Sequence, residues 1–276
     1  MPKNALVGLR EAPDLHVMSF NIRRRMVTVN PASPDLWRRR KPAMRRLLAS
    51  EQPTVLGVQE ALFEQATFVS ESLGDTYRRI GRGRNADGKG EGCPVFFDTR
   101  RVRLLDWRQL ALSDTPDEPG STTWGNRIPR IVVAATFLDK ATGLEFRFFN
   151  THFDHKSNRS RVKSSDLLAS LVDASELPAM ITGDFNTSIG TLPYDQLLMD
   201  ARLRDAWVAA SVRLTEAWGT FPDYRAPRLD RKRIDWILST RDIEVVEAGI
   251  NTSRFGGVWA SDHVPVQAVV RLGGAA

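Results

Sequence analysis

The chain has 276 residues, of which 42% are hydrophobic and 26% are charged. These proportions are ordinary for a soluble globular protein with one large or two small domains. No apolar stretch approaches the roughly 20 residues of a membrane-spanning helix, and residues 1–14 lack the apolar core of a secretory signal. Cys93 is the only cysteine, which excludes an intrachain disulfide. We therefore expect a cytoplasmic protein with no membrane partner.

Positive charge is concentrated in the first part of the chain. The net charge is +6, and residues 1–103 contain 19 Lys and Arg against 11 Asp and Glu. A polyanionic or phosphorylated substrate explains this excess. A solvated, arginine-rich surface explains it as well, and we favour that interpretation for the run Arg23–Arg25.

The hydrophobic pattern predicts strands interleaved with helices. In chain order, we expect a strand at Leu15–Phe20, a helix at Trp37–Ser50, a strand at Thr54–Val58, a helix at Ala61–Leu73, strands at Val95–Phe97, Ile131–Phe137 and Glu145–Asn150, a helix at Ser164–Ser175, and strands at Ala179–Thr182, Ile234–Leu238 and Val264–Arg271. Long loops are expected at 81–92, 113–129 and 219–233. No repeat or linker divides the chain, so we expect a single domain over residues 14–272 after a flexible N-terminus at residues 1–13.

Polar side chains follow the ends of the predicted strands. After Ala179–Thr182 come Gly183, Asp184, Phe185 and Asn186. Asp184 and Asn186 are two residues apart, so an extended backbone points them to the same side. A plain turn explains this stretch equally well by itself, because Gly, Asp and Asn favour turns. Since ligand sites gather at one end of the strands in layered α/β folds, the other strand ends favour a site: they carry Asn21, Glu60, His152, Asp154, Asp235, Asp262 and His263.

The residue types at these strand ends predict a metal of a particular kind. Carboxylates and amides are hard oxygen donors, which suit Mg²⁺ or Mn²⁺ and not zinc; the candidates are Asn21, Glu60, Asp184, Asn186 and Asp262. The histidines are better interpreted as contacts to a phosphate, because a protonated imidazole donates a charge-assisted hydrogen bond to an oxyanion.

Six fragments together resemble one known family, the endonuclease/exonuclease/phosphatase superfamily. They occur in the family's order between about Asp14 and Arg271, and they read MSFNIR (18–23), GVQE (57–60), NTHFD (150–154), GDFN (183–186), RIDWI (233–237) and SDHVPV (261–266). The resemblance implies an α/β (α+β) fold, a four-layer α/β/β/α sandwich of two packed mixed β-sheets flanked by helices. It also implies that residues 14–272 form one catalytic domain. Further fragments, among them THFDH (151–155), resemble a bacterial branch akin to the deadenylase-like members.

The resemblance and the residue chemistry together predict a role for each candidate. Glu60 is expected to be the main metal ligand, with Asn21 and Asp262 nearby. Asp184 is expected to orient or deprotonate the attacking water, and Asn186 to hold that water or the phosphate. His263, oriented by Asp235, and His152, oriented by Glu91, are expected to contact the phosphate. Substrate contacts are expected from four residues: Glu91, Arg130, Asp154 and Arg161.

These roles predict a Mg²⁺-dependent phosphoester hydrolase. We expect a phosphodiesterase or nuclease that acts on nucleic acid, including single-stranded nucleic acid, or on nucleotides. One alternative is a phosphomonoesterase that acts on a sugar, inositol or nucleotide phosphate. Another is a catalytically silent binding protein on the same scaffold, which the complete set of polar residues disfavours. No protein partner is expected.

Overall fold

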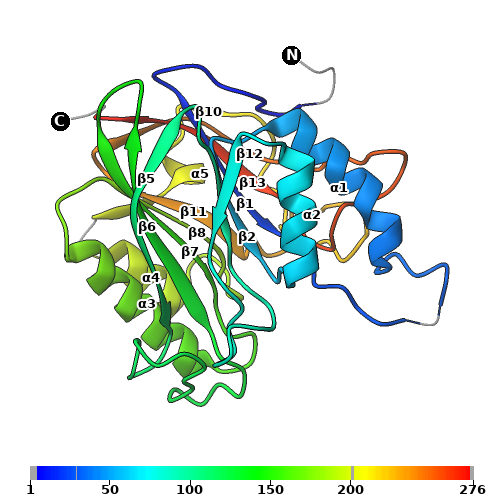
Figure 1. Ribbon diagram of the computed structural model, residues 1–276, viewed down its shortest axis with the longest axis horizontal. Coiled ribbons are helices and arrows are strands. Elements are labelled where there is room, and N and C mark those ends of the chain that lie inside the picture. The colour runs from blue at the N-terminus through cyan, green and yellow to red at the C-terminus, as the bar shows by residue number, and fades with distance from the viewer. Residues whose placement is uncertain (1–4, 29, 200–201, 274–276) are drawn as a thin grey trace.

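The computed structural model describes residues 5–28, 30–199 and 202–273. In these residues two β-sheets pack face to face, and helices cover the outer face of each sheet (Figure 1). The fold is the predicted four-layer α/β/β/α sandwich. Among the described residues, no helix is long and apolar enough to cross a membrane.

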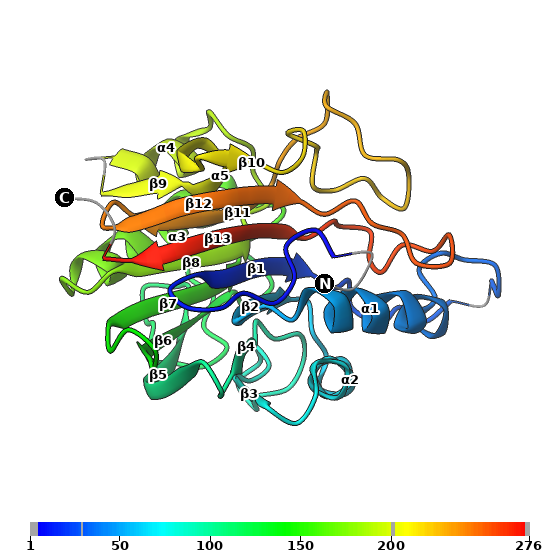
Figure 2. The ribbon, with the colours of Figure 1, turned by 90° about the horizontal axis from the view of Figure 1, so that it is seen from above.

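The first sheet has seven strands: β1 (Leu15–Asn21), β2 (Val55–Gln59), β3 (Tyr77–Ile80), β4 (Val95–Asp98), β10 (Val212–Arg213), β12 (Ile243–Ile250) and β13 (Val266–Leu272). They lie in the order β10-β12-β13-β1-β2-β4-β3, much of which can be followed in Figure 2. β1 and β2 are parallel neighbours, with Asn21 paired to Gln59 at their ends. The carboxyl ends of these two strands therefore reach the same edge of the sheet.

The second sheet has six strands: β5 (Val102–Ala111), β6 (Ile131–Asp139), β7 (Glu145–His152), β8 (Ala179–Asp184), β9 (Leu203–Asp205) and β11 (Asp235–Thr240). Their order is β5-β6-β7-β8-β11-β9. β7 and β8 are parallel and pair His152 with Asp184. β11 is antiparallel to β8, and its first residue, Asp235, also pairs with Asp184.

Five helices belong to the described residues: α1 (Trp37–Glu51), α2 (Phe63–Leu73), α3 (Asn158–Asp173), α4 (Leu192–Leu198) and α5 (Ala206–Ala209). α1 and α2 pack on the outer face of the first sheet, where Met44 and Leu47 share a buried cluster with Phe20. α3 and α4 cover the second sheet, where Leu168 lies in the same cluster as Phe149. The apolar stripes predicted for these helices therefore face the sheets, as amphipathic helices require.

The third apolar cluster lies between the sheets and is built from alternate strand residues. Leu15 and Val17 of β1, and Phe146 and Phe148 of β7, belong to it. Because side chains alternate across a strand, the next inward positions are polar: Ser19 and Asn21 in β1, and Asn150 and His152 in β7. The same alternation that builds the core thus directs polar groups into the space between the sheets at one edge.

The predicted strands are all present, with ends displaced by no more than two residues. The prediction missed β3, β5, β9, β10 and β12 and the short helices α4 and α5. β5 was hard to predict because its side chains are exposed and charged, at the edge of its sheet. The prediction also began α3 too late. The helix starts at Asn158 because the Ser157 side chain caps it by accepting a hydrogen bond from the Ser160 amide at 3.1 Å.

The segment 1–13, expected to be flexible, contacts the domain in its described part. The amides of Leu6, Val7 and Gly8 donate to the buried carboxylate of Glu51 at 2.8, 3.1 and 3.0 Å. The same carboxylate accepts from the side chains of Asn251 and Gln267, both at 2.8 Å. Residues 1–4 lie outside the described residues.

A buried amide contact joins the two sheets beneath the edge that carries the polar residues. Gln59 Nε2 of the first sheet donates to Asn150 Oδ1 of the second at 2.7 Å. Asn150 Nδ2 in turn donates to the carbonyls of Val58, Cys93 and Pro94 at 2.8–3.1 Å. The sheets approach so closely here that a Cβ atom on Gly57 would lie 2.1 Å from the Thr182 hydroxyl oxygen.

We expect the substitution Asn150→Ala to lower the free energy of unfolding by about 3 kcal/mol or more, because it leaves several buried groups without partners. Urea unfolding followed by circular dichroism measures this change. The matched control is Asn158→Ala on the exposed start of α3, for which we expect less than about 0.5 kcal/mol. Equal effects of the two substitutions would show that the contact between the sheets does not stabilise the fold.

Candidate active site

The edge described above brings together side chains from both sheets. β8 carries Asp184, and its neighbours in the sheet place His152 and Asp235 beside it. From the first sheet, Asn21 Nδ2 donates to Asp184 Oδ2 at 2.9 Å. The stacked rings of Phe185 and Trp236, with centroids 4.4 Å apart, pack the end of β8 against the start of β11. Strand pairing therefore brings His152, Asp184 and Asp235 together at this edge.

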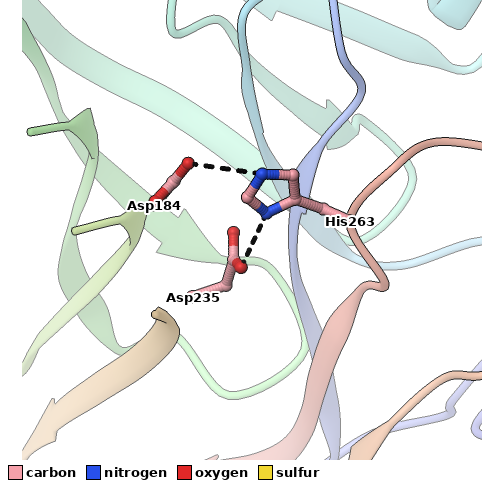
Figure 3. Close-up of side chains that lie close together, drawn as sticks. All are labelled: Asp184, Asp235 and His263. Carbon is pink, nitrogen blue, oxygen red and sulfur yellow. Dashed lines mark hydrogen bonds and ion pairs between the residues drawn. The ribbon is translucent and has the colours of Figure 1, made fainter. Parts of the chain in front are cut away.

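His263 lies between two carboxylates (Figure 3). Its Nδ1 is 2.9 Å from Asp235 Oδ2, and its Nε2 is 3.7 Å from Asp184 Oδ2. Burial alone would lower the pKa of His263, but the charges of Asp235 and Asp184 outweigh it and raise the pKa to about 10. The imidazole is therefore protonated at neutral pH, and its Nδ1 donates to Asp235.

Asp184 has an environment suited to exchanging a proton near neutral pH. Burial, and then the charge of Asp235, raise the pKa of Asp184 to about 7. The amide of Asn186 donates to its Oδ1 at 2.9 Å, and the Asn186 side chain donates to the Phe153 carbonyl at 3.0 Å. A general base works best when its pKa is close to the working pH.

His152 differs from His263 in its charge, although both line the same site. Its Nε2 is 3.6 Å from Asp184 Oδ2. Burial, together with the positive charges of Arg130 and Arg84, lowers the pKa of His152 well below its usual value. His152 is therefore neutral. The expected partner, Glu91, instead forms ion pairs with Arg84 at 2.9 Å and Arg24 at 3.2 Å.

Two sets of side chains near Asp184 have the chemistry to hold a metal ion. Ligand atoms of Asp184, Asp235 and His263 all lie within 4.8 Å of one another. The predicted set lies alongside: Glu60 Oε1 accepts from Asn21 Nδ2 at 3.2 Å. Burial raises the pKa of Asp262, and the charge of Glu60 raises it further. Buried carboxylates destabilise one another. A hard divalent cation therefore fits the set that contains Glu60 and Asp262, and it would relieve their repulsion.

Three residues of this region have left-handed backbone conformations that are unusual outside glycine: Arg23, Glu60 and Asn186, with φ of 52°, 60° and 50°. Such conformations cost of the order of 1 kcal/mol or more and cluster at functional sites. They turn the chain sharply where β1, β2 and β8 end. Sequence patterns do not reveal this strain, because none of the three is glycine.

The residues expected to bind substrate divide into two groups. Arg130 and Glu91 line the cavity of the site, whereas Asp154 and Arg161 do not. Asp154 Oδ2 accepts from Arg130 Nε at 3.3 Å, and Arg161 Nη1 donates to the Asp154 carbonyl at 2.8 Å. Asp154 and Arg161 therefore contact residues of the site without lining the cavity.

The cavity has a volume of about 360 Å³, and its lining combines carboxylates with arginine and histidine side chains. It is lined by Arg23, Arg24, Glu60, Arg84, Glu91, Ile128, Arg130, His152, His155, Asp184, Asn186, Phe221, Ile234, Asp262 and His263. The sequence analysis missed Arg23, Arg24, Arg84 and Phe221. Arg23 is not part of a solvated face, since its Nε is 3.2 Å from Asp35 and 3.4 Å from Asp262. The only signals for these residues were the basic clusters and the long loops at 81–92 and 219–233.

A two-sheet sandwich with buried carboxylates, a carboxylate-bound histidine and arginines around one cavity defines a phosphoester hydrolase. A family model described as "Endonuclease/Exonuclease/phosphatase family" matches residues 18–263. The chain belongs to this family, which confirms the resemblance seen in the sequence.

Solved bacterial structures are similar over almost the whole chain. A family protein of Bacteroides thetaiotaomicron is 30% identical, with a TM-score of 0.87 over 94% of this chain and 98% of its own. A mannosyl-6-phosphatase of the same organism is also 30% identical, with a TM-score of 0.86 over 93% of this chain and 99% of its own.

Similarity to curated sequences is more limited. An uncharacterized mimivirus protein, L388, is 40% identical over 37% of this chain, and the Drosophila melanogaster protein angel is 24% identical over 59% of it. The matches span 35% and 47% of those two proteins, so this chain covers less than half of each.

The pKa of His263 gives the protein a pH-dependent stability with a definite sign. A pKa raised from 6.5 to about 10 on folding stabilises the protein fully below pH 6.5, and this contribution is lost as the pH rises towards 10. We therefore expect the free energy of unfolding, measured with urea in EDTA, to decline between pH 7 and pH 9. The decline should be smaller in His263→Gln. An equal decline in both proteins would contradict the protonated state of His263.

Proposed function

We propose that this protein hydrolyses a phosphomonoester on a compact polar molecule, such as a sugar phosphate, with Mg²⁺ or Mn²⁺ as cofactor. The observation that carries the proposal is the cavity of about 360 Å³ at this site, whose lining combines carboxylates with arginine and histidine side chains. This volume suits a small metabolite, since ligand pockets begin at about 300 Å³.

The walls of the cavity favour a monoester over the diester that the sequence analysis placed first. The ion-paired residues Arg24, Glu91 and Arg84 line the cavity, and the ring of Phe221 packs on His263 with centroids 4.8 Å apart. A polymer backbone would need room on both sides of its phosphate. A monoester has three terminal oxygens and a second negative charge, which suit the many cationic groups. The 30% identity to a mannosyl-6-phosphatase supports a sugar phosphate.

The residues would divide the reaction as follows. Glu60, Asn21 and Asp262 would hold the metal, which supplies charge neutralisation at the phosphate when bound. Asp184 takes a proton from the attacking water as the water oxygen bonds to phosphorus and the ester oxygen leaves. Protonated His263, fixed by Asp235, donates a charge-assisted hydrogen bond to a phosphate oxygen, and neutral His152 donates a second.

A phosphodiesterase is the second candidate, and a specific surface favours it. A groove of about 630 Å³ lies beside α2 and the loop 81–92, and its lining includes Arg79, Arg82 and Lys89. Phe63 in the same groove is 78% exposed, and basic residues with an exposed aromatic ring are typical of single-stranded nucleic acid binding.

We expect Asp184→Asn to lower kcat by about 10³-fold or more, because the variant cannot accept the proton of water. The fold should persist, since the amide keeps the shape of the carboxylate. Asp173→Asn, an exposed carboxylate at the end of α3, is the control and should retain full activity. A folded Asp184→Asn protein with normal turnover would refute the assignment.

A substrate panel separates the candidate functions. Mannose 6-phosphate, p-nitrophenyl phosphate, bis-p-nitrophenyl phosphate and single-stranded oligonucleotides are compared with Mg²⁺, with Mn²⁺ and with EDTA. We expect the monoesters to have the higher kcat/KM, EDTA to abolish activity and Mg²⁺ to restore it. Faster hydrolysis of the oligonucleotide would establish the second candidate, and activity that persists in EDTA would contradict the role of a metal.

A further inference from the structure

The end of the cavity that is remote from His263 contains a buried guanidinium with a free donor. Arg130 immediately precedes β6 and is only 2% exposed. Its Nε donates to Asp154 Oδ2 at 3.3 Å, and its Nη2 lies 3.0 Å from His155 Nδ1. Its Nη1 is buried and has no hydrogen-bond partner among the described residues. Because buried donors are usually paired, this atom can donate to one further acceptor on a water or a ligand.

The hydrogen bond from Arg130 also fixes the state of His155. A guanidinium only donates hydrogen bonds, so His155 Nδ1 must accept, and the ring must be neutral with its proton on Nε2. Burial, and then the charge of Arg130, lower the pKa of His155, which agrees with a neutral ring. His155 lies at the rim of the same cavity. It therefore offers a second N–H donor at the cavity that Arg130 also lines.

Asp154 holds this arrangement in place. Its Oδ1 accepts from the amides of Lys156 and Ser157 at 2.9 and 2.7 Å, at the start of α3. Its Oδ2 is thereby fixed for Arg130. The guanidinium is pre-oriented before any ligand binds, which lowers the entropy cost of binding. Asp154 is thus a positioning residue for Arg130.

The position of Arg130 in the sheet separates it from the hydrolytic groups. β6 and β8 are two strand spacings apart, about 10 Å between their main chains, and β7 with His152 lies between them. Asp184 and His263 are at the β8 side of the cavity. Arg84 lies near Arg130, and its ion-pair partner Glu91 is shared with Arg24. An anion bound there would be a second one, distinct from the phosphate under attack.

We propose that Arg130 and His155, with Arg84 nearby, form a second anion subsite, so that the substrate is a compact phosphoester carrying another anionic group. The group is a carboxylate or a second phosphate, both of which accept hydrogen bonds from two neighbouring N–H donors. This inference rests on the proposed function, because it names the substrate class of the same cavity.

Three ligands that share a 6-phosphate test the subsite. Glucose 6-phosphate has no second anion, 6-phosphogluconate has a carboxylate, and glucose 1,6-bisphosphate has a second phosphate. Dissociation constants are measured by calorimetry with Mg²⁺ in the Asp184→Asn background, with and without Arg130→Gln or His155→Phe. We expect 6-phosphogluconate or glucose 1,6-bisphosphate, or both, to bind about tenfold or more tightly than glucose 6-phosphate. This difference in affinity should disappear with Arg130→Gln and become smaller with His155→Phe.

The controls distinguish the subsite from general electrostatics. Lys156→Gln removes a neighbouring positive charge that does not line the cavity, and it should preserve the difference in affinity. Asp154→Asn should reduce the difference, although Asp154 itself does not line the cavity. Equal binding of the three ligands to the parent protein would overturn the proposal, as would an equal weakening of all three by Arg130→Gln.

Hydrolysis is scored separately with the same ligands and unsubstituted protein. A preference for the second anion without hydrolysis would uphold the subsite and refute the phosphomonoesterase. Hydrolysis of all three ligands with equal KM would uphold the phosphomonoesterase and refute the subsite. Which of the two acidic ligands binds more tightly identifies the second group as carboxylate or phosphate.

Discussion

The hydrogen bond between Gln59 and Asn150 is the contact on which the site depends, because it fixes one sheet against the other directly beneath the cavity. The first sheet supplies Asn21 and Glu60, and the second supplies His152 and Asp184. The hydrogen bond from Asn21 to Asp184 joins the two sheets. Its length therefore depends on the distance between the sheets. A shift of one sheet against the other would move the predicted metal ligands Asn21 and Glu60 relative to Asp184.

Electrostatics then gives chemically similar residues different tasks. His263 and His152 are both buried against Asp184, yet His263 has carboxylates on two sides and is protonated, whereas His152 faces arginines and is neutral. Charges of both signs therefore line one small cavity. The carboxylates near Asp184 favour a metal, and the unpaired donor of Arg130 favours an anion.

Much of this arrangement could be predicted from the sequence. Strand pairing alone brings Asp184, His152 and Asp235 together. The position of each can be predicted from where its strand ends and from the two-residue alternation of side chains along a strand. The arginines were harder to place, because a long side chain at a loop can turn to solvent or to a site. Glu91 was expected to orient His152, but it forms ion pairs with Arg24 and Arg84, which come from different loops. Arg161 was expected at the substrate, but one turn of α3 directs it to the Asp154 carbonyl.

The sequence by itself determined the family, the layered fold and the set of carboxylates and histidines, because these depend on local periodicity and on motifs in a fixed order. Only the tertiary structure decided which histidine is charged, which arginine has a free donor and how large the cavity is. Those properties depend on burial and on distances between residues far apart in the chain. Asp154 and Arg130 illustrate the difference: the sequence marked both as substrate contacts, and the fold made one of them the support of the other.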